Sequence, residues 1–183
     1  PGPDRGVVFQ NHALLPWMTA RGNIEFGLRS ARPELSKAEH TKIAQDFLDE
    51  VSLGHAADRR PSRLSGGMQQ RVGLARAFAI GSDILLLDEP FGALDALTRR
   101  QLQSLLLNVW EENRRTVVMV THDVDEAVLL SDRIVVMSPG PEATIIEDIE
   151  VGLPRPRSGS DDSAVVERKN ELRERLLGLL ENG

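Results

Sequence analysis

The sequence predicts an α/β fold, because short apolar runs alternate with longer stretches of helical periodicity. Residues 84–87 read Ile-Leu-Leu-Leu, and residues 116–120 read Thr-Val-Val-Met-Val. An uninterrupted apolar run of this length is typical of a parallel strand that is buried on both faces. Helical patterns separate the runs. We therefore expect both runs to be buried strands of one sheet, with helices packed around it.

Composition limits the class of protein. The 183 residues suffice for one domain with a sizeable core, and the net charge of -6 argues against general nucleic-acid binding. The absence of cysteine excludes a disulfide framework and is consistent with a reducing cytosol. No apolar run approaches the roughly 20 residues needed to span a bilayer. Any association with a membrane is therefore expected to run through a partner protein.

Two carboxylates follow the first apolar run directly. Asp88 and Glu89 come after residues 84–87, and Pro90 then ends the predicted strand. The carboxyl ends of parallel strands are where open α/β sheets bind ligands. Asp88 is placed to hold a divalent metal ion, directly or through water, and Glu89 is placed to take a proton from an attacking water.

A second candidate site precedes a helix expected over residues 68–79. Two glycines, Gly66 and Gly67, allow the backbone to turn tightly and to approach a ligand closely. Free N–H groups at a helix start, together with the hydroxyl group of Ser65, form a site that favours anions. The stretch from 63 to 95 therefore predicts a phosphate cradle and a metal-plus-base pair.

These residues resemble the motifs of ATP-binding cassette (ABC) ATPases. Leu-Ser-Gly-Gly-Met-Gln-Gln-Arg, residues 64–71, resembles the signature motif, and residues 84–89 resemble the Walker B strand with its catalytic glutamate. Three single residues complete the resemblance: Gln10 for the Q-loop, Asp95 for the D-loop and His122 for the switch histidine. Five motifs in the right order are far more specific than any one alone, and together they cover residues 5–156.

The resemblance implies a P-loop NTPase core with an inserted helical subdomain. Residues 1–13 and 80–152 would form the α/β core, residues 14–79 the helical signature subdomain, and residues 153–183 a linker and a C-terminal helix. In that tail an apolar stripe of Val165, Leu172, Leu176 and Leu180 carries mixed charges around it, which favours packing on the domain over lying on a membrane.

The resemblance also implies roles for the motif residues. Two copies would dock head to tail, so that Ser65, Gly66, Gly67 and Gln69 of one copy contact the ATP held by the P-loop of the other. The resemblance gives catalytic roles to Glu89, which polarises the attacking water, to His122, which contacts the γ-phosphate, and to Gln10, which touches the metal or the attacking water. Asp88 holds Mg²⁺ together with Gln10, and Asp95 lies in the D-loop.

The P-loop itself is missing from the 183 residues. Its pattern G-x-x-x-x-G-K-[ST] needs a Gly-Lys pair, and none occurs. In the family the P-loop lies a few dozen residues before the Q-loop, whereas nine residues precede Gln10. The sequence is therefore interpreted as N-terminally truncated rather than as an inactive paralogue, since Glu89 and His122 remain. The 183 residues alone are expected not to hydrolyse ATP.

An apolar patch follows the Q-loop and consists of Leu14, Leu15, Pro16 and Trp17. One interpretation is that the patch belongs to the core of the helical subdomain. The other is that it forms a groove for a short helix of a membrane permease, since an aromatic residue among apolar neighbours is a common interface anchor. Both interpretations are compatible, because the floor of a groove is also core.

Three functions compete. The first is the ATPase subunit of a membrane importer. The second is a soluble ABC ATPase of DNA repair or translation, which usually carries long coiled coils or tandem cassettes that this sequence lacks. The third is a non-catalytic regulatory cassette without a P-loop. The importer is favoured by the signature together with residues 14–18.

Among importers, residues 6–17 and 94–99 resemble the nitrate, sulfonate and taurine group, and residues 138–141 with 153–157 are similar to its nitrate branch. We therefore expect import of a small anion, nitrate first (or nitrite, cyanate or bicarbonate), with sulfonate or taurine as the alternative. The substrate does not touch this subunit, so this expectation rests on analogy. The partners would be a second identical or different ABC ATPase subunit, a permease and, indirectly, a periplasmic solute-binding protein, with no nucleic acid. The location would be peripheral, on the cytoplasmic face of the inner membrane.

Overall fold

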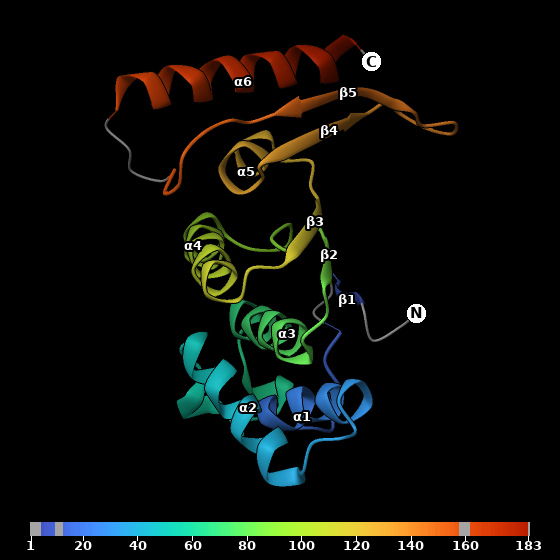
Figure 1. Ribbon diagram of the computed structural model, residues 1–183, viewed down its shortest axis with the longest axis vertical. Helices are drawn as coiled ribbons and strands as arrows, with labels where there is room; N and C mark the ends of the chain where they lie inside the picture. Colours follow the sequence, from blue (N-terminus) through green and yellow to red (C-terminus); the bar gives the residue numbers. More distant parts are fainter. Residues whose placement is uncertain (1–4, 10–12, 158–161, 183) are drawn as a thin grey trace. The chain divides into compact units, whose positions relative to one another are not determined.

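The computed structural model describes residues 5–9, 13–157 and 162–182 (Figure 1). The chain divides into two compact units, residues 1–120 and 121–183. The first unit contains the strands β1 (Arg5–Val8), β2 (Ile84–Asp88) and β3 (Thr116–Val120) and the helices α1 (Ala20–Ala31), α2 (Lys37–Glu50), α3 (Gly66–Ile80) and α4 (Ala96–Asn113). The second contains α5 (Val124–Leu130), β4 (Arg133–Met137), β5 (Ile145–Glu150) and α6 (Ser163–Asn182).

The sheet of the first unit has three parallel strands in the order β1-β2-β3. Leu86 at the middle of β2 pairs with Val7 on one side and with Val118 on the other. The two apolar runs recognised in the sequence are therefore neighbours in one sheet, as predicted. Parallel pairing requires crossover connections, and the helices between successive strands supply them.

The prediction that these strands are buried on both faces is wrong for the described part of the chain. Leu85 and Leu87 are fully covered, whereas Leu86 is 36% exposed and Val118 is 51% exposed. Figure 1 shows α3 and α4 on the same side of the three strands. An all-apolar run indicates that both faces favour burial, but each face is buried only where an element packs against it.

The helices begin where the sequence provides caps. The hydroxyl group of Ser36 accepts a hydrogen bond from the Glu39 N–H at 3.3 Å, and the Glu39 carboxylate accepts one from the Ser36 N–H at 2.7 Å. This capping box starts α2. The helix ends at Glu50, and Ser52, two residues later, takes a left-handed backbone with φ of 59°.

The second unit is a β-hairpin covered by helices. Strands β4 and β5 pair antiparallel, and α6 packs with α5 around a core that also includes Ile134, Val136 and Ile149. The predicted tail stripe is confirmed for Val165, Leu172 and Leu176, which belong to this core. It is wrong for Leu180, which is 52% exposed, because the neighbouring Leu179 packs against the core in its place. None of the helices in the described residues is both long and apolar enough to cross a bilayer.

Candidate functional site

The backbone of Glu89 is strained at the point where β2 ends. Its φ is 41°, in the left-handed region that non-glycine residues rarely adopt. The Glu89 N–H donates to the carbonyl oxygen of Val120 at 3.0 Å, so the turn is tied to the end of the neighbouring strand β3. Strained backbone of this kind gathers at functional sites, where the surrounding structure holds it. The turn therefore carries the Glu89 carboxylate at the carboxyl edge of the sheet.

Asp88 is the last residue of β2, and its side chain is exposed at the same edge. Within the described residues, no three His, Asp or Glu side chains gather closely enough to hold a metal ion by themselves. Mg²⁺ needs no such cage, since it is usually held by one or two carboxylates, waters and substrate phosphates. A single exposed carboxylate at a strand end therefore fits a Mg²⁺ ion that arrives with a nucleotide.

The residues that resemble the signature motif form an open helix start. Ser65 is the N-cap of α3, and its hydroxyl oxygen accepts a hydrogen bond from the Met68 N–H at 3.3 Å. Ser65 and Gly66 are exposed, while Gly67 is half-buried. The first N–H groups of this 15-residue helix lack partners within the helix itself and carry the positive end of its dipole. This geometry suits an anion such as a phosphate group.

Gln69 has a structural contact that the sequence did not indicate. Its amide nitrogen donates to the carbonyl oxygens of Pro61 and Leu64, each at 3.1 Å. Both hydrogens of that amide are therefore engaged by the turn that leads into α3. This geometry means that Gln69 shapes the approach to the signature.

Asp95, which we predicted to lie in a D-loop, is the N-cap of α4. Its Oδ1 accepts hydrogen bonds from the backbone N–H groups of Leu97, at 3.1 Å, and Thr98, at 3.0 Å. The backbone N–H and the hydroxyl group of Thr98 hold the pKa of this carboxyl group below its ordinary value. The carboxylate is thus kept ionised and fixed in direction at the start of α4.

The apolar patch at residues 14–17 forms a turn rather than a core. The Met18 N–H donates to the carbonyl oxygen of Leu15 at 3.1 Å, which closes a turn around Pro16 and Trp17. Trp17 is 65% exposed, so the core interpretation fails for this side chain. The turn presents the indole ring outward, as an interface anchor would be presented.

Two residues that sequence reasoning missed hold this turn. Asn23 on α1 is fully buried, and its amide bonds the backbone of Leu15 and the carbonyl oxygen of Thr19. Arg76 on α3 donates to the carbonyl oxygen of Ala13 at 3.0 Å, and burial lowers the pKa of its guanidinium. One signal pointed to Asn23: it is a polar residue on the buried face of an amphipathic helix, beside Ile24.

His122 lies in the second unit, directly before Asp123, the N-cap of α5, and its side chain is exposed. The surrounding loop is tightly bonded: the Thr121 hydroxyl group donates to Glu126 at 2.8 Å, and Asp123 accepts from the Glu126 N–H at 3.1 Å. Asp123 thereby caps α5 and fixes the backbone on the C-terminal side of the histidine. Gln10, the other predicted catalytic residue, lies outside the described residues.

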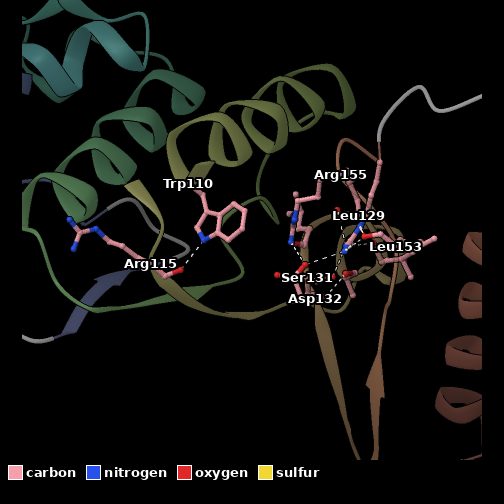
Figure 2. Close-up of polar contacts among 11 residues, drawn as sticks. Trp110, Arg115, Leu129, Ser131, Asp132, Leu153 and Arg155 are labelled. Carbon is pink, nitrogen blue, oxygen red and sulfur yellow. Dashed lines mark hydrogen bonds and ion pairs between the residues drawn. The ribbon is translucent and has the colours of Figure 1, made fainter. Parts of the chain in front are cut away.

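A buried arginine at the opposite end of α5 was also missed. Arg157 is only 2% exposed, and it donates to the carbonyl oxygens of Val128, at 3.1 Å, and Ser131, at 2.5 Å. It shares the Asp132 carboxylate with Arg155, at 3.1 and 2.7 Å; Figure 2 shows Arg155 and Asp132 together. Burial, reinforced by the charge of Arg155, lowers the pKa of Arg157. The segment after β5 therefore clamps the last turn of the helix that follows His122.

Comparison with known proteins identifies the class. A match to the ABC transporter family covers residues 2–92. A dimeric structure of the ATP-binding cassette MJ0796 in a post-hydrolysis state, bound to ADP and Pi, shares the fold with a TM-score of 0.68 and 36% identity, over 81% of this chain and 63% of that chain. The chain belongs to the ABC transporter family, whose members bind ATP.

Its relatives include transporters of small anions. The nitrate import ATP-binding protein NrtD of Synechococcus elongatus is 53% identical over 182 residues, and the nitrate transport protein NasD of Klebsiella oxytoca is 50% identical over 184 residues. Each alignment covers 98% of this chain but only 65% of NrtD and 69% of NasD. The bicarbonate transport ATP-binding protein CmpC of Synechococcus elongatus is 56% identical over 88% of this chain, which spans 24% of that protein.

Proposed function

We propose that this protein is the ATP-hydrolysing subunit of an ABC importer for a small anion, most specifically nitrate. The observation that carries the catalytic part is the strained turn at Glu89, which is tied to β3 through its N–H bond to Val120 at 3.0 Å. A carboxylate at the carboxyl end of a parallel strand can accept the proton of an attacking water. Asp88, one residue earlier, would hold Mg²⁺ together with Gln10.

The signature would act on the nucleotide of a second subunit. We propose that Ser65, Gly66 and Gly67 contact the γ-phosphate of ATP bound by the partner, with the α3 dipole favouring its charge. Gln69 would support this contact by holding the preceding turn. Hydrolysis removes the γ-phosphate, so ATP would favour the closed dimer and its products the open one. His122 would contact the same phosphate, and Asp95 would lie in the D-loop beside it.

The same proposal includes a division of the chain. Residues 1–13 and 80–152 would form the catalytic core, residues 14–79 the helical signature subdomain, and residues 153–183 a linker and C-terminal helix. The turn around Pro16 and Trp17, with Leu14 and Leu15 behind it, would receive a short helix of the permease. The subunit would then be peripheral, on the cytoplasmic face of the inner membrane, and a periplasmic solute-binding protein would act through the permease.

The transported anion is proposed from the relatives alone, because no residue of this subunit would touch it. Nitrate is favoured by NrtD and NasD, which match almost the whole chain; bicarbonate is supported by CmpC. Measuring ATP hydrolysis by the reconstituted transporter with nitrate, bicarbonate, taurine and a sulfonate separates these substrates. We expect stimulation by nitrate, and stimulation by bicarbonate alone would reassign the substrate without changing the catalytic proposal.

The catalytic proposal is tested with Glu89→Gln in the full-length protein. The amide keeps the shape of the carboxylate but cannot accept the proton, so we expect turnover to fall by at least about a hundredfold while ATP binding persists. The ATP-bound dimer should accumulate, as seen by size-exclusion chromatography. Glu111→Gln, an exposed glutamate on α4, is the control and should hydrolyse ATP normally. Near-normal hydrolysis by Glu89→Gln would refute the assignment.

A further inference from the structure

Glu126 is a buried carboxylate to which the proposed function assigns no role. It lies in the first turn of α5, shortly after His122 in the chain, and it is only 5% exposed. Carboxylates are almost never fully buried unless they are paired or hydrogen-bonded. Oε2 of Glu126 accepts a hydrogen bond from the Thr121 hydroxyl group at 2.8 Å. The buried group therefore bonds back to the loop that carries the histidine.

The Thr121 hydroxyl group has two partners. It donates to Glu126 and accepts a hydrogen bond from the Asp123 N–H at 3.0 Å. In an ordinary capping box, a glutamate at the third helical position accepts the N–H of the N-cap residue directly. Asp123 is the N-cap of α5 and Glu126 is that third residue, and the Thr121 hydroxyl group lies between them. The cap of α5 is thereby extended to the residue on the N-terminal side of His122.

A third hydrogen bond closes the loop around His122. The Glu126 N–H donates to Oδ1 of Asp123 at 3.1 Å. The residues on both sides of His122 are thus bonded to Glu126, Thr121 through its hydroxyl group and Asp123 through its carboxylate. A buried polar network whose members have partners is rigid. His122 is therefore fixed on both sides by one residue of α5.

Helix α5 is itself anchored in the second unit. Val128 belongs to the hydrophobic core of that unit. Near the end of the helix, Arg157 donates hydrogen bonds to the carbonyl oxygens of Val128 and Ser131. Because Glu126 lies on the same short helix, the packing of α5 determines where its carboxylate lies, and the bonded loop follows.

We propose that Glu126 is a positioning residue for His122 and that it acts through the Thr121 hydroxyl group. The proposal rests on the function proposed above, in which His122 contacts the γ-phosphate. Glu126 itself would touch no nucleotide, but it would fix the backbone from which the imidazole ring reaches the phosphate. Such placement matters, because a misplacement of about 1 Å can lower a rate on the order of a hundredfold.

The link is tested by kinetics of Thr121 variants of the full-length protein. Thr121→Val keeps the shape of the side chain but loses the hydroxyl group, so kcat should fall about tenfold while KM for Mg-ATP stays within about twofold. Thr121→Ser keeps the hydroxyl group and should retain kcat within about threefold. Wild-type kcat in Thr121→Val would contradict the positioning role.

Glu126→Gln separates the hydrogen bond from the charge. The amide keeps an oxygen that can accept the bond from the Thr121 hydroxyl group, so kcat should stay within about threefold of wild type. A tenfold loss in Glu126→Gln would show that the charge of the carboxylate is needed, and the proposed route through Thr121 would then be wrong.

Thr41→Val is the matched control for stability. The Thr41 hydroxyl group on α2 donates to the Glu25 carboxylate on α1 at 2.8 Å, the same type and length of bond as that between Thr121 and Glu126. Its removal should lower the thermal midpoint by a similar amount but leave kcat unchanged. Equal losses of kcat in Thr41→Val and Thr121→Val would show a general effect of stability and would overturn the proposal.

A second readout does not depend on ATP hydrolysis. The Cε1–H resonance of His122 in NMR spectra, assigned by its loss in His122→Gln, reports the surroundings of the imidazole ring. Thr121→Val should shift this resonance, whereas Thr121→Ser and Thr41→Val should leave it in place. An unshifted resonance in Thr121→Val would show that Thr121 does not fix the histidine.

A double variant separates this proposal from the proposed function. If Thr121 acts through His122, adding Thr121→Val to His122→Ala should slow single-turnover hydrolysis by no more than about twofold. A further tenfold loss would overturn the positioning role and leave the ATPase assignment intact. A wild-type protein that hydrolyses no Mg-ATP would overturn the proposed function, and the NMR comparison would still decide whether Thr121 fixes His122.

Discussion

The buried amide of Asn23 forms reciprocal hydrogen bonds with the backbone of Leu15. The Leu15 N–H donates to Oδ1 of Asn23 at 2.7 Å, and Nδ2 of Asn23 donates to the Leu15 carbonyl oxygen at 3.2 Å. The same Nδ2 also donates to the carbonyl oxygen of Thr19 at 2.9 Å. One side chain on α1 thus fixes the turn that exposes Trp17.

Replacing Asn23 should loosen that turn. We expect Asn23→Ala to lower the free energy of unfolding by about 2 kcal/mol, because it leaves the buried N–H and carbonyl groups of the turn without their partner. Urea denaturation of the full-length protein measures this change. Asn108→Ala, at an exposed position on α4, should stay within about 0.5 kcal/mol of wild type. Equal stabilities of the two variants would contradict the role of Asn23.

Replacing Trp17 should leave the stability of the protein almost unchanged but weaken its binding to the permease. The ring is 65% exposed, so Trp17→Ala should change the free energy of unfolding by less than about 0.5 kcal/mol. If the turn binds the permease, affinity should fall at least about tenfold, as for an aromatic anchor. Co-purification or titration with the permease measures the effect. Leu177→Ala, an exposed apolar residue on α6, serves as the control and should bind normally.

Removing the hydrogen bonds of Arg157 should lower the free energy of unfolding strongly. Arg157→Met leaves several buried carbonyl groups without their shared donor and leaves Asp132 with Arg155 alone, and we expect a loss of about 3 kcal/mol in the free energy of unfolding. Arg157→Lys keeps the charge but loses the planar fork, so its loss should be smaller, about 2 kcal/mol. Arg168→Ala removes only an exposed pair with Glu171 and should cost less than about 1 kcal/mol. Similar losses for the Arg157 and Arg168 variants would show that the clamp contributes little.

Glu50 gives the protein a component of stability that falls as pH rises. Burial, with help from the Glu112 carboxylate, raises the pKa of Glu50 above its ordinary value of 4.5. The folded state therefore binds this proton more tightly than the unfolded state, and the stabilisation present at low pH is lost as pH rises through the raised pKa.

We expect Glu50→Gln to gain stability relative to wild type as pH rises from 4.5, by no more than about 0.5 kcal/mol, since solvent screens much of the repulsion. Glu39 provides a control of opposite sign, because the side chain and backbone of Ser36 lower its pKa. The stabilisation by Glu39 is present above its unfolded pKa and is lost as pH falls through the lowered pKa, so Glu39→Gln should lose stability relative to wild type as pH rises towards 4.5. Urea denaturation between about pH 3 and pH 7 covers both windows, and parallel curves for the two variants would refute both assignments.

Much of the fold follows from local patterns in the sequence. Ser36, Ser65 and Asp95 each begin a helix by accepting backbone N–H groups, and such capping depends only on residues two or three positions along the chain. The apolar runs at 84–87 and 116–120 also form strands for a local reason, because a short β-branched or aliphatic run favours extended backbone. The ABC motifs can be recognised in the sequence because each is a short stretch of consecutive residues.

The tertiary structure decided which surfaces are covered and which polar groups have partners. Leu86 and Leu87 read alike in the sequence, yet only Leu87 is packed, because burial depends on which helices lie over the sheet. Asn23 and Arg157 belong to no recognisable motif. Their roles come from backbone groups that the fold brings to them, for Arg157 from residues 26 to 29 positions away. The Thr98 methyl group lies over Gly67 only because α3 and α4 pack together. Contacts between segments distant in the chain arise from packing, so a local sequence pattern does not predict them.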